Sequence, residues 1–227
     1  MNRGSLPLAA VTGQEEHHVV AFDGAVQLHR SVIAPVRALT DLARSVGIQL
    51  SVASGFRSYD RQTMIWNAKA TGRRPVFDHR GKPLDVASMP PEQAVRAILR
   101  WSALPGTSRH HWGTDMDVWD RGAVGDDYAL QLVPEEYAAG GPFAALDHWL
   151  GGEQVADLGF FRPYALDRGG VAPEPWHLSY RPLAAEFSAS LDADSLRPCL
   201  AAADIALKDT VLAMLDEIFD RFVICDG

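Results

Sequence analysis

The sequence predicts an α+β fold, with a small, mainly antiparallel sheet and helices packed against it. Three observations indicate this class. Apolar residues recur at helical spacing between residues 26 and 46. Short runs at 48–52, 159–161 and 176–180 have the length and apolar character of strands. Residues 200–222 carry an amphipathic pattern that is typical of a packing helix.

The size of the chain favours one domain. Its 227 residues are 47% hydrophobic and 22% charged, an ordinary globular composition that allows a sizeable core. We expect a single domain in three parts. Residues 1–25 form an arm that is extended or contains a short strand, residues 26–181 form the core, and residues 182–227 form a C-terminal helical segment.

Local signals punctuate the first half of the core. Pro35 lies inside the first helical pattern and predicts a kink or a break, and Gly47 suits the C-terminal end of that helix. After the strand at 48–52, Ser58 is placed to cap a helix over 59–69. Arg57 then lies at the corner between strand and helix, where functional groups are often carried.

The second half of the core alternates loops and helices. Residues 71–90 are rich in Pro, Gly and charge and predict a long loop that covers a cleft. A helix with proline in its first turn is expected over 91–104, and another over 142–150, where two glycines follow.

Composition and hydropathy bear on partners and compartment. A net charge of -8 without a basic block argues against nucleic acid, and no stretch has the apolar length of a transmembrane helix. The short N-terminal apolar run, broken by Pro7, does not resemble a secretory signal, so we expect a cytoplasmic protein, with the periplasm or the extracellular space as alternatives. Cys199 and Cys225 are expected to be free, buried thiols rather than a disulfide.

Four side chains in two distant stretches suggest chemistry. The segment 108–120, SRHHWGTDMDVWD, contains His110 and Asp117, and about sixty residues later Glu174 and His177 follow. Two imidazoles and a carboxylate can bind zinc and leave a fourth position open, and a second carboxylate nearby can accept a proton. These are the parts of a catalytic zinc site.

Spacing alone leaves the ligands ambiguous. His110 and Asp117 are seven residues apart, so a straight strand would send them to opposite faces, although Gly113 between them allows a bend. His111 is a neighbouring alternative to His110. Asp115 competes with Asp117, because both lie on the same face of one strand.

Three motifs together resemble a known family. Ser108-x-His110-x-x-Gly113-x-x-x-Asp117, with Glu174-Pro175-Trp176-His177 downstream and Ser54-Gly55-Phe56-Arg57-Ser58 upstream, is similar to the D-alanyl-D-alanine carboxypeptidases of the VanY type. These belong to a wider group of zinc peptidases that includes D-Ala-D-Ala dipeptidases and lysostaphin-like enzymes. The motifs stand in the family's order, and the resemblance covers about 30–181.

The resemblance implies roles for particular residues. His110, Asp117 and His177 would bind Zn²⁺ in a cleft on the sheet, Glu174 would be the catalytic carboxylate, and Arg57 would hold substrate and stabilise charge on its carbonyl oxygen. The residues expected near the substrate are Ser108, Gln62 and Trp176. The family usually has a small residue, often Ala, where this chain has Asp115, so the resemblance leaves the exact specificity open.

The function implied by the resemblance is zinc-dependent hydrolysis of the C-terminal D-Ala bond of a cell-wall peptide, of D-Ala-D-Ala or L,D type. The expected partner is a short peptide or a peptidoglycan stem peptide. Two alternatives are a peptidoglycan endopeptidase of the lytic-enzyme type and a non-catalytic peptide-binding domain that keeps the zinc pocket. Glu174 and Arg57 argue against the second, because a binding domain needs no general base.

Overall fold

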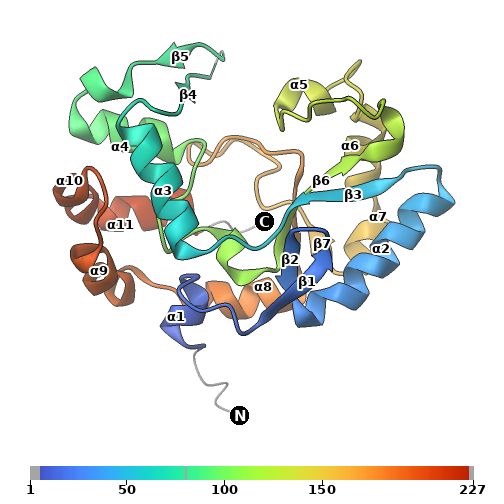
Figure 1. Cartoon of the computed structure of the whole chain (residues 1–227), viewed down its shortest axis with the longest axis horizontal. Coiled ribbons are helices and arrows are strands. Elements are labelled where there is room, and N and C mark those ends of the chain that lie inside the picture. The colour runs from blue at the N-terminus through green and yellow to red at the C-terminus, as the bar shows by residue number, and fades with distance from the viewer. Residues whose placement is uncertain (1–5, 80, 225–227) are drawn as a thin grey trace.

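The central sheet is small and antiparallel throughout. The computed structural model describes residues 6–79 and 81–224. Within them the four-stranded sheet has the order β3-β6-β8-β7, and Figure 1 shows helices arranged around it. The strands are β3 (Leu50–Ser54), β6 (Asp115–Asp120), β7 (Phe160–Phe161) and β8 (His177–Tyr180). This confirms the predicted α+β class.

The N-terminal region contains more structure than an extended arm. A short helix α1 (Leu8–Val11) precedes a hairpin of β1 (Val19–Asp23) and β2 (Val26–His29), and helix α2 (Ile33–Ser45) follows. The kink or break predicted at Pro35 is wrong, because the residue is the third of α2 and the helix runs on through it. A proline in the first turn interrupts no helical hydrogen bond. The helix ends before Gly47, whose φ is 84°, as predicted.

Helix α3 (Tyr59–Ala70) leads into a segment whose structure differs from the sequence-based prediction. Ser58 caps this helix as predicted, with its Oγ accepting from the Arg61 N–H at 3.2 Å. The segment 71–90 is not only a loop: it contains the short hairpin β4 (Val76–Phe77) and β5 (Pro83–Leu84). It packs on helix α4 (Pro91–Leu99), which ends five residues before the predicted limit.

The remaining helices are short. Helices α5 (Pro134–Tyr137), α6 (Ala144–Leu150) and α7 (Glu153–Asp157) lie between β6 and β7 in the chain. After β8 come α8 (Arg181–Ser188), α9 (Ala193–Ala202), α10 (Lys208–Ala213) and α11 (Leu215–Ile218). The single helix predicted over 200–222 is wrong. The chain breaks at 203–207, where Leu207 has a left-handed φ of 62°.

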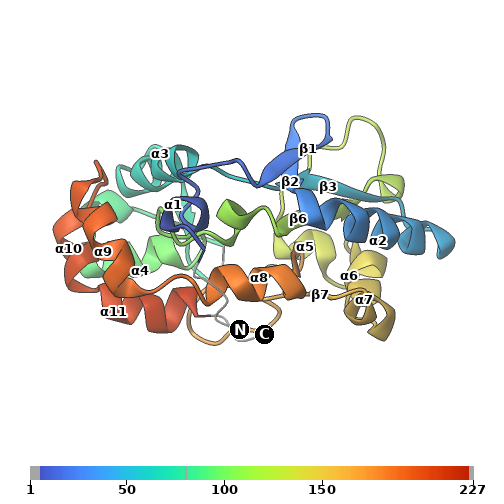
Figure 2. The same ribbon diagram turned by 90° about the horizontal axis from the view of Figure 1, so that it is seen from below.

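Two buried apolar clusters flank the site. One joins the sheet to α2, α5, α6 and α7, and includes Leu39, Met116 and Phe143. The other joins α3 and α4 to α9, α10 and α11, and includes Trp66 and Ile98. Figure 2 shows these two groups of helices at opposite ends of the molecule. Within the described residues, no helix is both long and apolar enough to cross a bilayer.

Candidate metal centre

Strand register brings two predicted ligands together. Ser54 of β3 pairs with Asp117 of β6, and Asp117 pairs with His177 of β8. Paired residues on neighbouring strands present their side chains on one face. The Ser54 Oγ donates to Asp117 Oδ2 at 2.7 Å, and His177 Nδ1 lies 3.5 Å from Asp117 Oδ1. The sheet itself therefore places Asp117 and His177.

A tight turn supplies the third predicted ligand. His110 lies on a 3₁₀ turn, 109–112, and Gly113 after it has a φ of 66°. A Cβ on Gly113 would lie 2.7 Å from the His29 backbone nitrogen, so the turn needs glycine. The turn returns His110 to the sheet, with Nε2 3.5 Å from Asp117 Oδ1. The seven-residue offset is thus bridged as the sequence suggested.

The three side chains fit a divalent cation. One ligand atom from each of His110, Asp117 and His177 lies within 4.8 Å of the others, and all three residues are buried. Among the described residues, Asp117 Oδ1 has no hydrogen-bond donor although it is buried. A buried carboxylate oxygen usually has a partner. Two imidazole nitrogens facing that oxygen form a donor set suited to zinc.

Outer contacts fix which nitrogen of each ring faces the centre. His110 Nδ1–H donates to the Gly55 carbonyl at 2.8 Å, so Nε2 is left for the centre. His177 Nε2–H donates to Asp115 Oδ1 at 3.0 Å, so Nδ1 is left. Such partners orient the ligand rings of metal sites.

Asp115 thereby lies behind His177 rather than among the three grouped side chains. Its side chain is fully buried and also accepts from Arg109 Nε at 2.7 Å, Thr114 Oγ1 at 2.6 Å and Ser179 Oγ at 3.1 Å. Burial opposes its ionisation, but Arg109 and His177 hold its pKa well below the usual range. Asp115 is therefore an ionised support for His177.

His111 is placed away from the centre. Its Nδ1–H donates to the Arg57 carbonyl at 2.6 Å, and its Nε2 accepts from the Gly106 N–H at 3.1 Å. Burial lowers the pKa of His111 to about 3, so the ring is neutral. Both nitrogens are used by the backbone, and the structure assembles His110, not His111, with the other two residues.

A small cavity opens on the centre. It has a volume of about 200 Å³. The predicted site residues that line it are Arg57, Ser108, His110, Asp117, Glu174, Trp176 and His177. Glu174 Oε2 lies 3.4 Å from His177 Nδ1, and its side chain is 16% exposed. Arg57 interacts electrostatically with Asp117 and Glu174.

Gln62 lies outside this lining. It is fully buried, accepts from Arg57 Nη1 at 3.0 Å, and donates to Ser102 Oγ and the Ala103 carbonyl. Its contacts hold Arg57 in place. The lining residues that sequence reasoning missed include Trp101 and Tyr164, and the Tyr164 ring packs edge-on against His177 at 4.9 Å between centroids. Both lie in loops with no motif to mark them.

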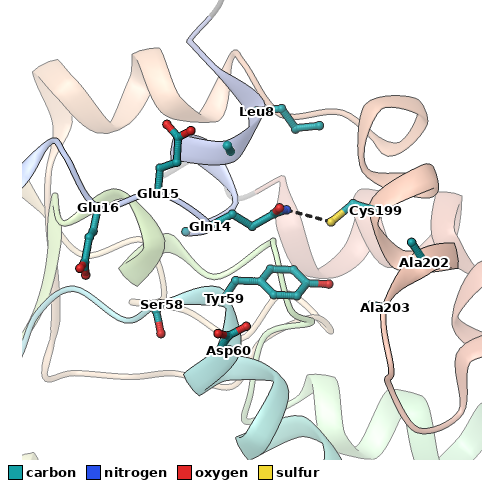
Figure 3. A pocket seen from close by; sticks show the side chains of 12 residues that line it. Leu8, Gln14, Glu15, Glu16, Ser58, Tyr59, Asp60, Cys199, Ala202 and Ala203 are labelled. Atoms are coloured by element: carbon teal, nitrogen blue, oxygen red, sulfur yellow. Dashed lines mark hydrogen bonds between the residues drawn. The ribbon is translucent and has the colours of Figure 1, made fainter.

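A larger cavity of about 930 Å³ lies elsewhere, between the N-terminal arm, the start of α3 and α9. Figure 3 shows Tyr59 beneath Gln14, whose Nε2 lies 3.0 Å from Cys199 Sγ. Cys199 is a free thiol as expected, but half-buried rather than buried; Cys225 lies outside the described residues. Among the described residues, the metal-type cluster lies at the sheet and not in this cavity.

The fold and the candidate site together indicate a class of chemistry. A buried His–Asp–His set on a small antiparallel sheet, with a glutamate beside it and a cavity in front, is suited to metal-assisted hydrolysis. The comparison with protein families gives the particular family. Residues 25–183 match the VanY family of D-alanyl-D-alanine carboxypeptidases, and the chain belongs to that family.

One relative with a named activity agrees with this assignment. The chain is 30% identical over 147 residues to a D-alanyl-D-alanine carboxypeptidase of Enterococcus faecalis, covering 63% of this chain and 44% of that protein. It is 32% identical over 123 residues to an uncharacterized protein of Haemophilus influenzae, covering 53% of this chain and 93% of that protein.

Solved structures share the fold. VanYB in complex with D-alanine-D-alanine superposes with a TM-score of 0.55 at 20% identity, over 92% of this chain and 93% of that chain. A variant of the vancomycin-resistance D,D-pentapeptidase VanY in complex with Zn(II) gives 0.54 at 22% identity, over 87% and 91%. The LD-carboxypeptidase LdcB gives 0.52 at 21% identity, over 87% and 78%.

Asp115→Asn is expected to weaken metal binding by about 10- to 100-fold, the usual effect of removing a partner behind a ligand. The substitution removes the charge that orients His177. Competition with a chelator measures the affinity. Asp41→Asn is the control, because Asp41 is exposed on α2 and pairs only with the nearby Arg44 among the described residues. Unchanged affinity in Asp115→Asn would show that other contacts hold the ring.

Metal binding is also expected to depend on pH. Burial alone would lower the pKa of His177, but hydrogen bonds with Asp115 and Glu174 and the charge of Asp117 raise it to about 9 without a bound ion. A metal ion must displace this proton, so affinity should rise with pH up to about 9. Titration with zinc near neutral pH should release about one proton from His177.

The same pKa has the opposite effect on folding of the metal-free protein. A folded-state pKa above the ordinary value of 6.5 means that His177 stabilises the fold fully below that pH. This stabilisation is lost as the pH rises to about 9. For metal binding, an affinity that stays constant from pH 6.5 to about 9 would contradict the role of His177 as a ligand whose proton the metal ion displaces.

Proposed function

We propose that this chain is a zinc-dependent carboxypeptidase that removes the C-terminal D-alanine of cell-wall peptides, at a D-Ala-D-Ala or an L,D-type bond. The observation that carries the proposal is the position of Glu174, 3.4 Å from the ring nitrogen of His177 that faces the centre. Three ligands leave a coordination position open, and a carboxylate stands beside it. Membership of the VanY family supports the substrate class.

His110, Asp117 and His177 would hold the ion. When bound, zinc supplies Lewis acidity, lowering the pKa of a water molecule and polarising the scissile carbonyl. Glu174 takes a proton from the attacking water as the new C–O bond forms, and gives it to the leaving amine as the C–N bond breaks. Asp117 contributes one negative charge against two positive ones, so the centre keeps a net positive charge for an anionic transition state.

Arg57 and its neighbours position the substrate. Arg57 Nη1 donates to Gln62, and its backbone N–H donates to the His110 carbonyl at 3.1 Å, so the guanidinium is anchored to the centre. A fixed guanidinium can bind a terminal carboxylate or stabilise charge on the carbonyl oxygen. Ser108 and Trp176 contribute to the cavity wall that would contact the peptide.

A matched pair of peptides tests the function. The zinc-loaded protein is incubated with a pentapeptide ending in D-Ala-D-Ala and with its C-terminally amidated twin, and released D-alanine is measured. We expect cleavage of the free acid only, and loss of cleavage with a chelator. Equal cleavage of both would favour an endopeptidase. One equivalent of bound zinc without cleavage of any D,D- or L,D-peptide would favour a binding domain.

A further inference from the structure

A second cavity adjoins the metal centre. It has a volume of about 490 Å³, and Arg57 lines both it and the smaller site cavity. Ser54, which also lines it, donates to Asp117. We call this cavity the arginine groove, because Arg57, Arg61 and Arg74 line it. Ser54, Phe56 and Ile65 also belong to its lining.

The groove collects positive charge in an acidic protein. Arg61 and Arg74 are both exposed, and within residues 6–79 and 81–224 neither side chain forms an ion pair or a hydrogen bond. Glu16 is the one acidic residue in the groove lining. Lys69 interacts electrostatically with Arg57 and Arg74, and its Nζ donates to the Trp101 carbonyl at 3.2 Å. The chain as a whole carries a net charge of -8.

These cations repel each other, so their grouping has a cost. Arg61 lies in the first turn of α3, where the helix dipole disfavours a positive charge. Arg57 interacts unfavourably with both Arg61 and Arg74. A bound anion would turn this repulsion into attraction, and guanidinium groups bind carboxylates through paired hydrogen bonds.

The position of the groove defines which anion it can take. The site cavity, at about 200 Å³, holds only the end of a peptide. The rest of the bound peptide must continue past the wall of this cavity, and the groove begins at Arg57, which lines both cavities. Phe56 and Ile65 add apolar surface for small side chains. An anion in the groove would therefore belong to the same peptide.

We propose that the arginine groove binds a carboxylate on the part of the peptide that precedes the cleaved bond, through Arg61 and Arg74. The inference rests on the proposed function, because it assumes a peptide held at the centre. It makes the enzyme selective for acidic peptides over peptides whose upstream carboxylate is an amide.

Binding is measured with zinc-loaded Glu174→Gln protein, so that no cleavage disturbs the titration. Two pairs of D-Ala-D-Ala-ended pentapeptides are used, each pair differing only by a free carboxylate or a carboxamide, at residue 2 or at residue 3. In at least one pair the acid should bind about five- to tenfold more tightly. Added salt should reduce this difference.

Groove variants then locate the effect. In an Arg61→Gln/Arg74→Gln double variant the acid and amide peptides should bind equally, with the affinity for the amide changed by less than about twofold. Arg37→Gln is the matched control, since Arg37 is exposed on α2 and outside the groove. Equal binding of acid and amide in both pairs, or a difference that survives in the double variant, overturns the proposal.

Cleavage by the wild-type protein separates this proposal from the proposed function. Cleavage of acid and amide peptides at equal efficiency would support the carboxypeptidase function and contradict the proposed carboxylate binding in the groove. The opposite outcome is tighter binding of the acid peptide, lost in the double variant, without cleavage of any peptide. That outcome would support carboxylate binding in the groove and contradict the peptidase function.

Discussion

Glu174→Ala is expected to reduce kcat by about 10³- to 10⁴-fold while the protein still binds one equivalent of zinc, because one general acid–base residue contributes about 10²- to 10⁴-fold. The upper part of that range applies, since the same carboxylate serves both bond formation and bond cleavage. The metal should remain because His110, Asp117 and His177 are untouched. Metal content and turnover of a D-Ala-D-Ala-ended peptide are the two measurements.

Glu153→Ala is the control for that experiment, because Glu153 is exposed at the start of α7. The control should keep both activity and metal. Normal turnover by Glu174→Ala would remove Glu174 from the mechanism. Loss of metal together with activity would instead show that Glu174 is a ligand. Its Oε2 lies 3.4 Å from His177 Nδ1, so metal content has to be measured alongside turnover.

Asp117→Asn is expected to abolish zinc binding in practice, with an affinity loss beyond the 10- to 100-fold typical of residues behind the ligands. The amide keeps the size of the side chain but loses the charge on Oδ1, which is buried without a donor in the described structure. Zinc should raise the melting temperature of the wild-type protein by mass action, and should leave that of the variant unchanged.

Asp41→Asn again serves as the control, and should respond to zinc as the wild-type protein does. At zinc concentrations that support full activity of the wild-type protein, hydrolysis by Asp117→Asn should fall to background. A variant that still gains thermal stability from zinc and cleaves peptide would show that another side chain replaces Asp117 as a ligand.

The short motifs located the candidate site, but their spacing could not choose between neighbouring residues, and only the family resemblance favoured His110 and Asp117. Asp115 and Asp117 share one strand face, so periodicity treats them alike. The pairing of Asp117 with both Ser54 and His177 distinguishes them, and pairing depends on residues distant in sequence. His110 and His111 are distinguished by the turn at Gly113 and by backbone partners of His111.

Helix boundaries were harder to predict for a related reason. Pro35 reads as a helix breaker unless the start of the helix is known, and here β2 occupies the residues that precede α2. The apolar pattern over 200–222 continues through a break at 203–207, because both helices bury the same kind of face. Cavity residues such as Tyr164 carry no local pattern at all. The division of the chain at 25 and 181 stays a prediction.

The placement of two proposed ligands, Asp117 and His177, on paired strands links the centre to correct folding of the sheet. Alternate residues of a strand point to opposite faces, so a slip of one residue between β6 and β8 would turn Asp117 away from His177. Metal affinity is therefore a sensitive gauge of strand alignment. A substitution that shifts the register of this sheet can leave the helix content unchanged. Loss of metal binding would then be the first sign of the misaligned strands.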